Sequence, residues 1–114
     1  KTDNGGDITQ HTAEAERVVK MCGVWGKIPV KAGAHNDYGD IRARLGKADF
    51  DGHEAIDFII SQAHVRRSQK LVLLAVGKLT NIALALEKDP SIIPKVKVVW
   101  LGSHWPGAAG LYRR

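Results

Sequence analysis

The chain has 114 residues, of which 44% are hydrophobic and 25% are charged, as is ordinary for one globular domain with a core of its own. No apolar run approaches the roughly 18 residues of a membrane span, so we expect no membrane partner. The net charge is +5, but the basic residues are scattered and not interleaved with aromatic ones, so we expect no nucleic-acid partner either. The polar start does not resemble a signal peptide, and the lone Cys22 cannot form an internal disulfide, so localisation stays open.

The first predicted helix begins after Asp7, which forms a capping-box pattern with Gln10, and ends at Gly23. Apolar residues recur between them at helical spacing. The next element is a short strand over Lys27–Lys31, in which Pro29 favours an edge position or a strand start. A helix followed by a strand is the first half of an α/β pattern.

A polar, glycine-containing loop is predicted over residues 33–47. Its residues His35, Asp37 and Asp40 could hold a metal or line the rim of a sugar pocket, or they could simply belong to a loop. Asp51 and Glu54 then repeat the capping-box spacing in front of a helix with an apolar face.

The second half reads as strand, helix and strand: Leu71–Val76, Leu79–Lys88 and Val96–Leu101. The unbroken apolar run of the first of these strands predicts burial on both faces, with the Val76 side chain in the core. Three strands alternating with helices predict an α/β fold, a three-layer αβα arrangement with a mostly parallel sheet and right-handed βαβ crossovers, as one domain over residues 1–114.

Four segments in order carry a family resemblance: IPVKAGA, HEAIDFII, LVLLAVGKLTNIALAL and DPSIIPKVKVVWLGS. The chain resembles the inosine/uridine-preferring nucleoside hydrolases, above all in its second half. The resemblance implies hydrolysis of the N-glycosidic bond of a ribonucleoside, giving ribose and free base, with calcium activating the attacking water.

The resemblance also implies site residues. The Val76 carbonyl matches a calcium ligand, Asn4 is the nearest match to an asparagine that contacts ribose, and Leu101 matches a residue that packs on the nucleoside. His104 follows the last strand at the carboxyl end of the sheet, where ligands gather, and is a candidate substrate-binding residue. The family's DxDxxxDD aspartates would precede Lys1 and its late His-Asp pair would follow Arg114. We therefore expect no catalytic residue in this chain, and an incomplete domain that is inactive alone.

Structural explanations and a second function remain open. Thr80 and Asn81 are expected to bond backbone groups near the helix end rather than substrate, and Trp100 to pack on a helix. Gly77 is expected to need positive φ or a close backbone approach, so Gly77→Val should destabilise the fold. The alternative function is a small α/β binding or interaction module that pairs through an open sheet edge, and a homo-oligomer stays open.

Overall fold

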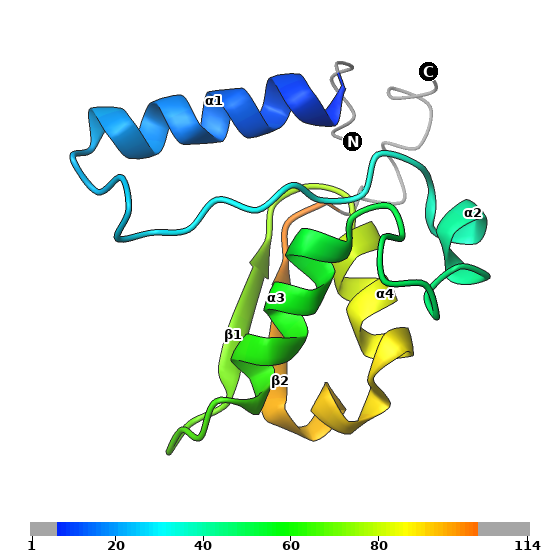
Figure 1. Ribbon diagram of the computed structural model, residues 1–114. Coiled ribbons are helices and arrows are strands. Elements are labelled where there is room, and N and C mark those ends of the chain that lie inside the picture. The colour runs from blue at the N-terminus through cyan, green and yellow to red at the C-terminus, as the bar shows by residue number, and fades with distance from the viewer. Residues whose placement is uncertain (1–6, 103–114) are drawn as a thin grey trace, which may run out of the picture.

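A computed structural model describes residues 7–102 of the protein. Its helices and strands follow the order shown in Figure 1: α1 (Ile8–Met21), α2 (Tyr38–Arg42), α3 (His53–His64), β1 (Leu71–Ala75), α4 (Thr80–Lys88), the 3-10 helix η1 (Pro90–Lys95) and β2 (Val96–Trp100). The second half therefore has the predicted strand–helix–strand order. None of the helices in this part of the chain combines the length and the apolar character needed to cross a membrane.

The sheet of the described region consists of β1 and β2, which pair in parallel from Leu71 opposite Val96 to Ala75 opposite Trp100. Helix α4 and η1 connect the two strands, so the predicted parallel βαβ unit is confirmed, while its right-handedness stays a prediction. The predicted strand over Lys27–Lys31 is wrong, because this segment is irregular. A strand needs a hydrogen-bonded neighbour, and the backbone there lies beside no strand of the described region.

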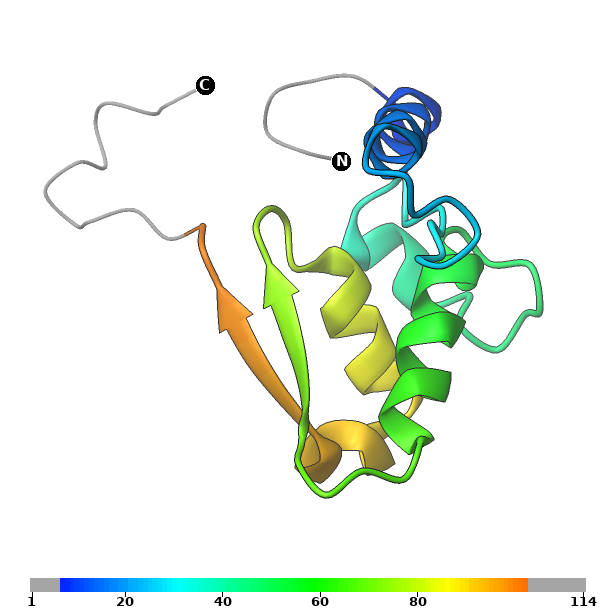
Figure 2. The same cartoon turned by 90° about the vertical axis from the view of Figure 1, so that its left-hand side faces the viewer.

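Helices α3 and α4 cover one face of the sheet, as Figure 2 shows. The core between these layers is built around Ile56, Leu84 and Ile92, whose side chains are fully buried. The α/β class is thus evident, and residues 7–102 form two layers. A three-layer arrangement is not confirmed.

The other face of the sheet is uncovered, and the predicted burial of β1 on both faces is wrong. Val72, Leu74 and Val76 are 56%, 69% and 73% exposed, whereas Ala75 on the inner face is buried. A continuous apolar run is typical of a strand covered on both sides, but the covering must come from another element. No element of the described region lies over this face.

Helix α1 confirms its predicted start but not a place in the core. The Gln10 backbone N–H donates to Asp7 Oδ1 at 2.8 Å, and the Asp7 N–H donates to Gln10 Oε1 at 3.2 Å. None of the residues of α1 is buried, and Met21 at its end is 72% exposed. In Figure 1 the helix lies apart from α3 and α4, beyond the carboxyl ends of the strands.

The predicted capping box at the start of α3 is not formed. Gly52 is the N-cap residue, with φ of 86°, and no side chain caps the helix there. A methyl group on Gly52 would lie 2.7 Å from the backbone nitrogen of Ala34, so glycine is needed both for its φ and for the close approach. Gly77 does not share this conformation, because the described glycines with positive φ are Gly23, Gly26 and Gly52. The conformational part of the Gly77 prediction is therefore wrong.

Candidate functional site

The candidate site lies at the carboxyl ends of β1 and β2, where two of the predicted residues meet. The Leu101 N–H donates to the Ala75 carbonyl at 2.9 Å, so Leu101 lies beside the residue that follows β1, which is Val76. Both side chains are exposed, Val76 at 73% and Leu101 at 75%. The expectation that the Val76 side chain lies in the core is wrong, because no layer covers this face in the described region.

The turn after β1 is fastened to the end of β2. The Trp100 indole Nε1–H donates to the Gly77 carbonyl at 2.9 Å. Trp100 is 46% exposed, so its expected packing on a helix is not what the structure shows. Its ring spans the two strand ends instead, and Gly102 lies so close to it that a methyl group there would be 2.4 Å from the indole nitrogen.

Asn81, in the first turn of α4, ties a distant loop to the same place. Its Oδ1 accepts a hydrogen bond from the Ala34 N–H at 2.8 Å, across 47 positions of sequence. Gly33 lets the loop come this near, because a methyl group on it would lie 2.5 Å from Asn81 Nδ2. Asn81 bonds a backbone group as expected, but the predicted bonding at the helix end is wrong, because no side chain caps α4 and the partner is Ala34, the last residue of the IPVKAGA segment. The sequence carries no direct signal of this contact, because it joins residues 47 positions apart.

A second connection joins the loop and the turn, because Lys78 Nζ lies 3.6 Å from Asp37 Oδ1. The loop, the turn and the start of α1 enclose a hollow of about 260 Å³. Of the described residues, neutral and basic ones line it and none with a carboxylate does; the lining includes Ile8, His11, Thr12, Lys31, Gly33 and Lys78. Among the described residues, the hollow offers backbone and amide hydrogen bonds and the imidazole of His11, a side-chain type that can act as a general acid or base, but no carboxylate.

Asp51 holds the loop from its other side, a role that the sequence did not indicate. Its carboxylate accepts from the His35 N–H at 3.0 Å, the Asn36 N–H at 2.8 Å and Asn36 Nδ2 at 3.1 Å. Partial burial would raise the pKa of the Asp51 carboxyl, but the donors from Asn36 and His35 stabilise the charged form more. The pKa of Asp51 therefore lies below its ordinary value.

We expect Asp51→Asn to lower the free energy of unfolding by about 1 kcal/mol at pH 7, because charge-assisted hydrogen bonds are weakened. Because the folded-state pKa is lowered, the carboxylate's contribution is present above the unfolded pKa of about 3.9 and is lost as pH falls through the folded value. The difference between wild type and variant should therefore shrink below about pH 4. Urea unfolding from pH 7 to pH 2.5 measures it. Asp49→Asn removes a nearby exposed aspartate as the control, and an equal pH dependence in both variants would contradict the assignment.

The described residues do not fit a calcium ion. Calcium takes roughly six to eight oxygen ligands, several of them carboxylates. No group of three or more His, Cys, Asp or Glu side chains within residues 7–102 could hold a metal ion, so the loop residues His35, Asp37 and Asp40 do not form a metal cluster. A single backbone carbonyl at Val76 cannot hold calcium. Asn4 and His104 lie outside the described residues.

Comparison with known proteins gives this geometry its context. The family model described as inosine-uridine preferring nucleoside hydrolase matches residues 4–107. An uncharacterized protein of Schizosaccharomyces pombe, C1683.06c, is 34% identical over 67 residues, which are 59% of this chain and 21% of that protein. The chain thus matches about a fifth of the length of this relative. No solved structure gives a significant match. The family match covers most of the chain, including both strands and the turn between β1 and α4, and the chain therefore belongs to the inosine-uridine preferring nucleoside hydrolase family.

Proposed function

We propose that this chain forms part of a site that binds a ribonucleoside for hydrolysis of its N-glycosidic bond to ribose and free base. The family match over residues 4–107 carries the proposal. The structure supports it by gathering the turn after β1, the end of β2 and the loop at Gly33 at the carboxyl end of a parallel sheet. Ligands of open α/β sheets bind at this end.

The proposed contacts follow from exposure and position. Leu101 presents an apolar side chain, 75% exposed, which would pack on the nucleoside. Asn4 and His104 are proposed as further substrate contacts. The Val76 carbonyl is proposed as one ligand of calcium, a cofactor that would need its carboxylates from outside residues 7–102. We propose in addition that residues 1–114 belong to one domain that this chain does not complete.

We expect the 114-residue chain alone to release no ribose from inosine or uridine, because its described part offers neither a calcium cage nor a carboxylate in the hollow. Ribose is measured as reducing sugar and base by ultraviolet absorbance, with and without added calcium. Turnover above the enzyme-free blank in either condition would contradict the proposed inactivity.

Binding is tested separately from turnover by titrating ribose and inosine while recording amide chemical shifts. Changes confined to Gly77, Lys78 and Leu101 would support the site, and Leu101→Asp should reduce them. Lys97→Asp is the control, because Lys97 lies near the amino end of β2, the strand that Leu101 directly follows. No change, or equal change in both variants, would contradict the placement of the nucleoside.

A second function has an observation in its favour. The outer face of the sheet exposes Val72, Leu74 and Val76, and each strand has one unpaired edge in the described region. An exposed apolar face with open edges is typical of a surface that pairs with another polypeptide. We propose an interaction module, including self-association, as the alternative. The titration above separates the two, because an interaction module has no reason to respond to ribose.

A further inference from the structure

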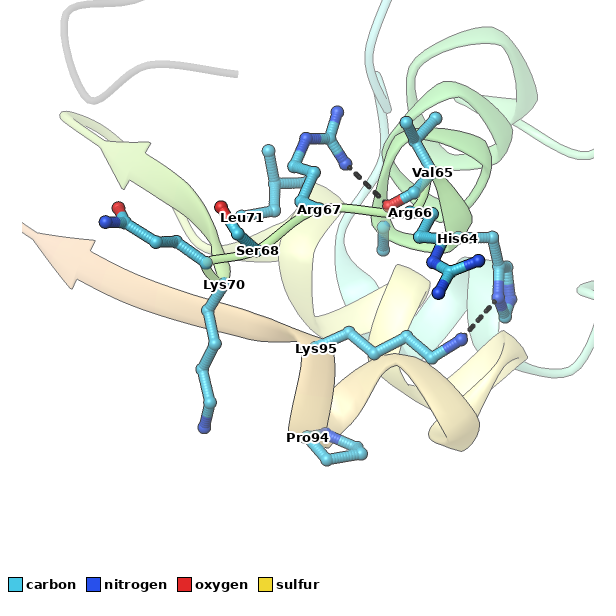
Figure 3. A pocket seen from close by; sticks show the side chains of 11 residues that line it. His64, Val65, Arg66, Arg67, Ser68, Lys70, Leu71, Pro94 and Lys95 are labelled. Carbon is cyan, nitrogen blue, oxygen red and sulfur yellow. Dashed lines mark hydrogen bonds between the residues drawn. The ribbon is translucent and has the colours of Figure 1, made fainter.

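A pocket with a different chemistry lies at the opposite end of the strands. It opens where α3 ends and where β1 and β2 begin, and its volume is about 430 Å³. Figure 3 shows the side chains that line it. Among the described residues, four basic side chains line it and no acidic one does; the four are Arg66, Arg67, Lys70 and Lys95. The fold therefore brings four of the 17 basic residues of the sequence to one pocket.

The four basic side chains differ in the hydrogen-bond partners that they already have. Arg67 is committed to the end of α3, because its guanidinium donates to the Gln62 and Val65 carbonyls and to Gln62 Oε1. Lys95 Nζ lies 3.1 Å from His64 Nδ1. Arg66 makes no hydrogen bond or ion pair with any residue of the described part of the chain, and neither does Lys70.

Within residues 7–102, the carboxylate that bonds to His64 belongs to Asp89, and both of its oxygens already have hydrogen-bond partners. His64 Nε2 lies 2.6 Å from Asp89 Oδ2, and the other oxygen of Asp89 accepts from the Ser91 N–H at 3.1 Å and the Ser91 hydroxyl at 2.5 Å. With its Nε2–H donated to Asp89, His64 presents Nδ1 as an acceptor to Lys95. Asp89 is therefore engaged by His64 and Ser91, and it forms no ion pair with Arg66.

The directions of the basic side chains show which of them could contact one ligand together. In Figure 3, Arg66 and Lys95 extend toward the side of the pocket where His64 lies, whereas Lys70 extends away from them. Two cations that face a common space repel each other unless an anion lies between them. A guanidinium offers paired donors that match a phosphate, and an ammonium adds a point charge.

We propose that this pocket binds a phosphate group, with Arg66 as its bidentate donor and Lys95 as the second cation. The volume suits a phosphate carried on a small organic molecule. The site is separate from the candidate nucleoside site, because it lies at the amino ends of the strands that carry the latter at their carboxyl ends. It does not depend on the proposed hydrolysis.

Chemical-shift titration of the 114-residue chain at constant ionic strength tests the proposal. The probes are inorganic phosphate and adenosine monophosphate, with adenosine and sodium acetate as comparisons. We expect both phosphates to shift amides of residues 66–70 and 95. We expect Arg66→Gln to weaken phosphate binding about tenfold, the loss that follows when a charge-assisted hydrogen bond is removed. Arg44→Gln removes the same charge from an exposed site elsewhere and should leave binding unchanged.

The outcomes are distinct. Tighter binding of the monophosphate than of inorganic phosphate identifies a phosphorylated small molecule as the ligand, and equal binding identifies free phosphate. Equal weakening by Arg66→Gln and Arg44→Gln would overturn the proposal, because it would show nonspecific attraction by the net charge. Absence of phosphate-dependent shifts would overturn it as well. The proposal would also be overturned if a short RNA oligonucleotide bound to wild type and to Arg66→Gln equally well while inorganic phosphate bound to neither.

Discussion

Replacing Gly52 by alanine is expected to lower the free energy of unfolding by about 3 kcal/mol, a large fraction of the stability of a small domain. Two costs combine. The residue has φ of 86°, which side chains rarely adopt, and the new methyl group would lie 2.7 Å from a backbone nitrogen and 2.8 Å from the Cα of Ala34. Backbone cannot give way as the end of a flexible side chain can, so either the loop or α3 must shift.

Two matched glycines separate these costs. Gly23 has φ of 69° and nothing within 4 Å of an added methyl group, so Gly23→Ala should show the conformational cost alone, about 1 kcal/mol. Gly46 has open space and no positive φ, so Gly46→Ala should be close to neutral. Urea unfolding followed by circular dichroism gives the three values. If Gly52→Ala costs no more than Gly23→Ala, the close approach of α3 to the loop at Ala34 is contradicted.

Leu84→Ala is expected to cost about 3 kcal/mol, because its side chain is fully buried in α4 and its removal leaves a cavity among the side chains of α3 and η1. Leu74→Ala is the matched control, since Leu74 is 69% exposed on the uncovered face of β1. Its loss should cost less than about 1 kcal/mol. The same unfolding measurement compares them at one protein concentration.

The comparison also tests how the sheet exists in solution. If Leu74→Ala costs as much as Leu84→Ala, the outer face of β1 is covered by another polypeptide or a second copy, and the alternative function as an interaction module gains support. A concentration-dependent midpoint would indicate self-association, because binding to the folded state stabilises it by mass action. Equal midpoints across concentrations with a small Leu74 effect would contradict self-association.

Local patterns were sufficient for much of this protein. The capping box of Asp7 with Gln10 forms as predicted, because both partners lie within one helical turn. The strand–helix–strand unit of the second half follows from apolar period and from the breakers at its ends, with boundaries within about two residues of those observed. The segment order also carried the family, which the match over residues 4–107 shows.

What the tertiary structure decided concerns contacts between distant segments. Asp51 has the spacing of a helix cap, yet it binds the backbone of His35 and Asn36, because the loop offers it two N–H donors and Gly52 starts the helix instead. The sequence shows that a strand is apolar, but it does not show which other element covers the apolar face. Within residues 7–102, the segment Lys27–Lys31 has strand character but pairs with no strand, and no element covers the outer apolar face of β1.

The grouping of charged side chains likewise depends on contacts between distant segments. Arg66 and Lys95 are 29 positions apart in the sequence, and only the crossover through α4 and η1 brings them to one pocket. Periodicity, caps and breakers act over one or two turns of chain, so the sequence by itself determined the start of α1, the elements of the second half and the family. Which backbone donor a carboxylate finds, which face of a strand is covered and which cations meet are properties of packing, and only the tertiary structure decided them.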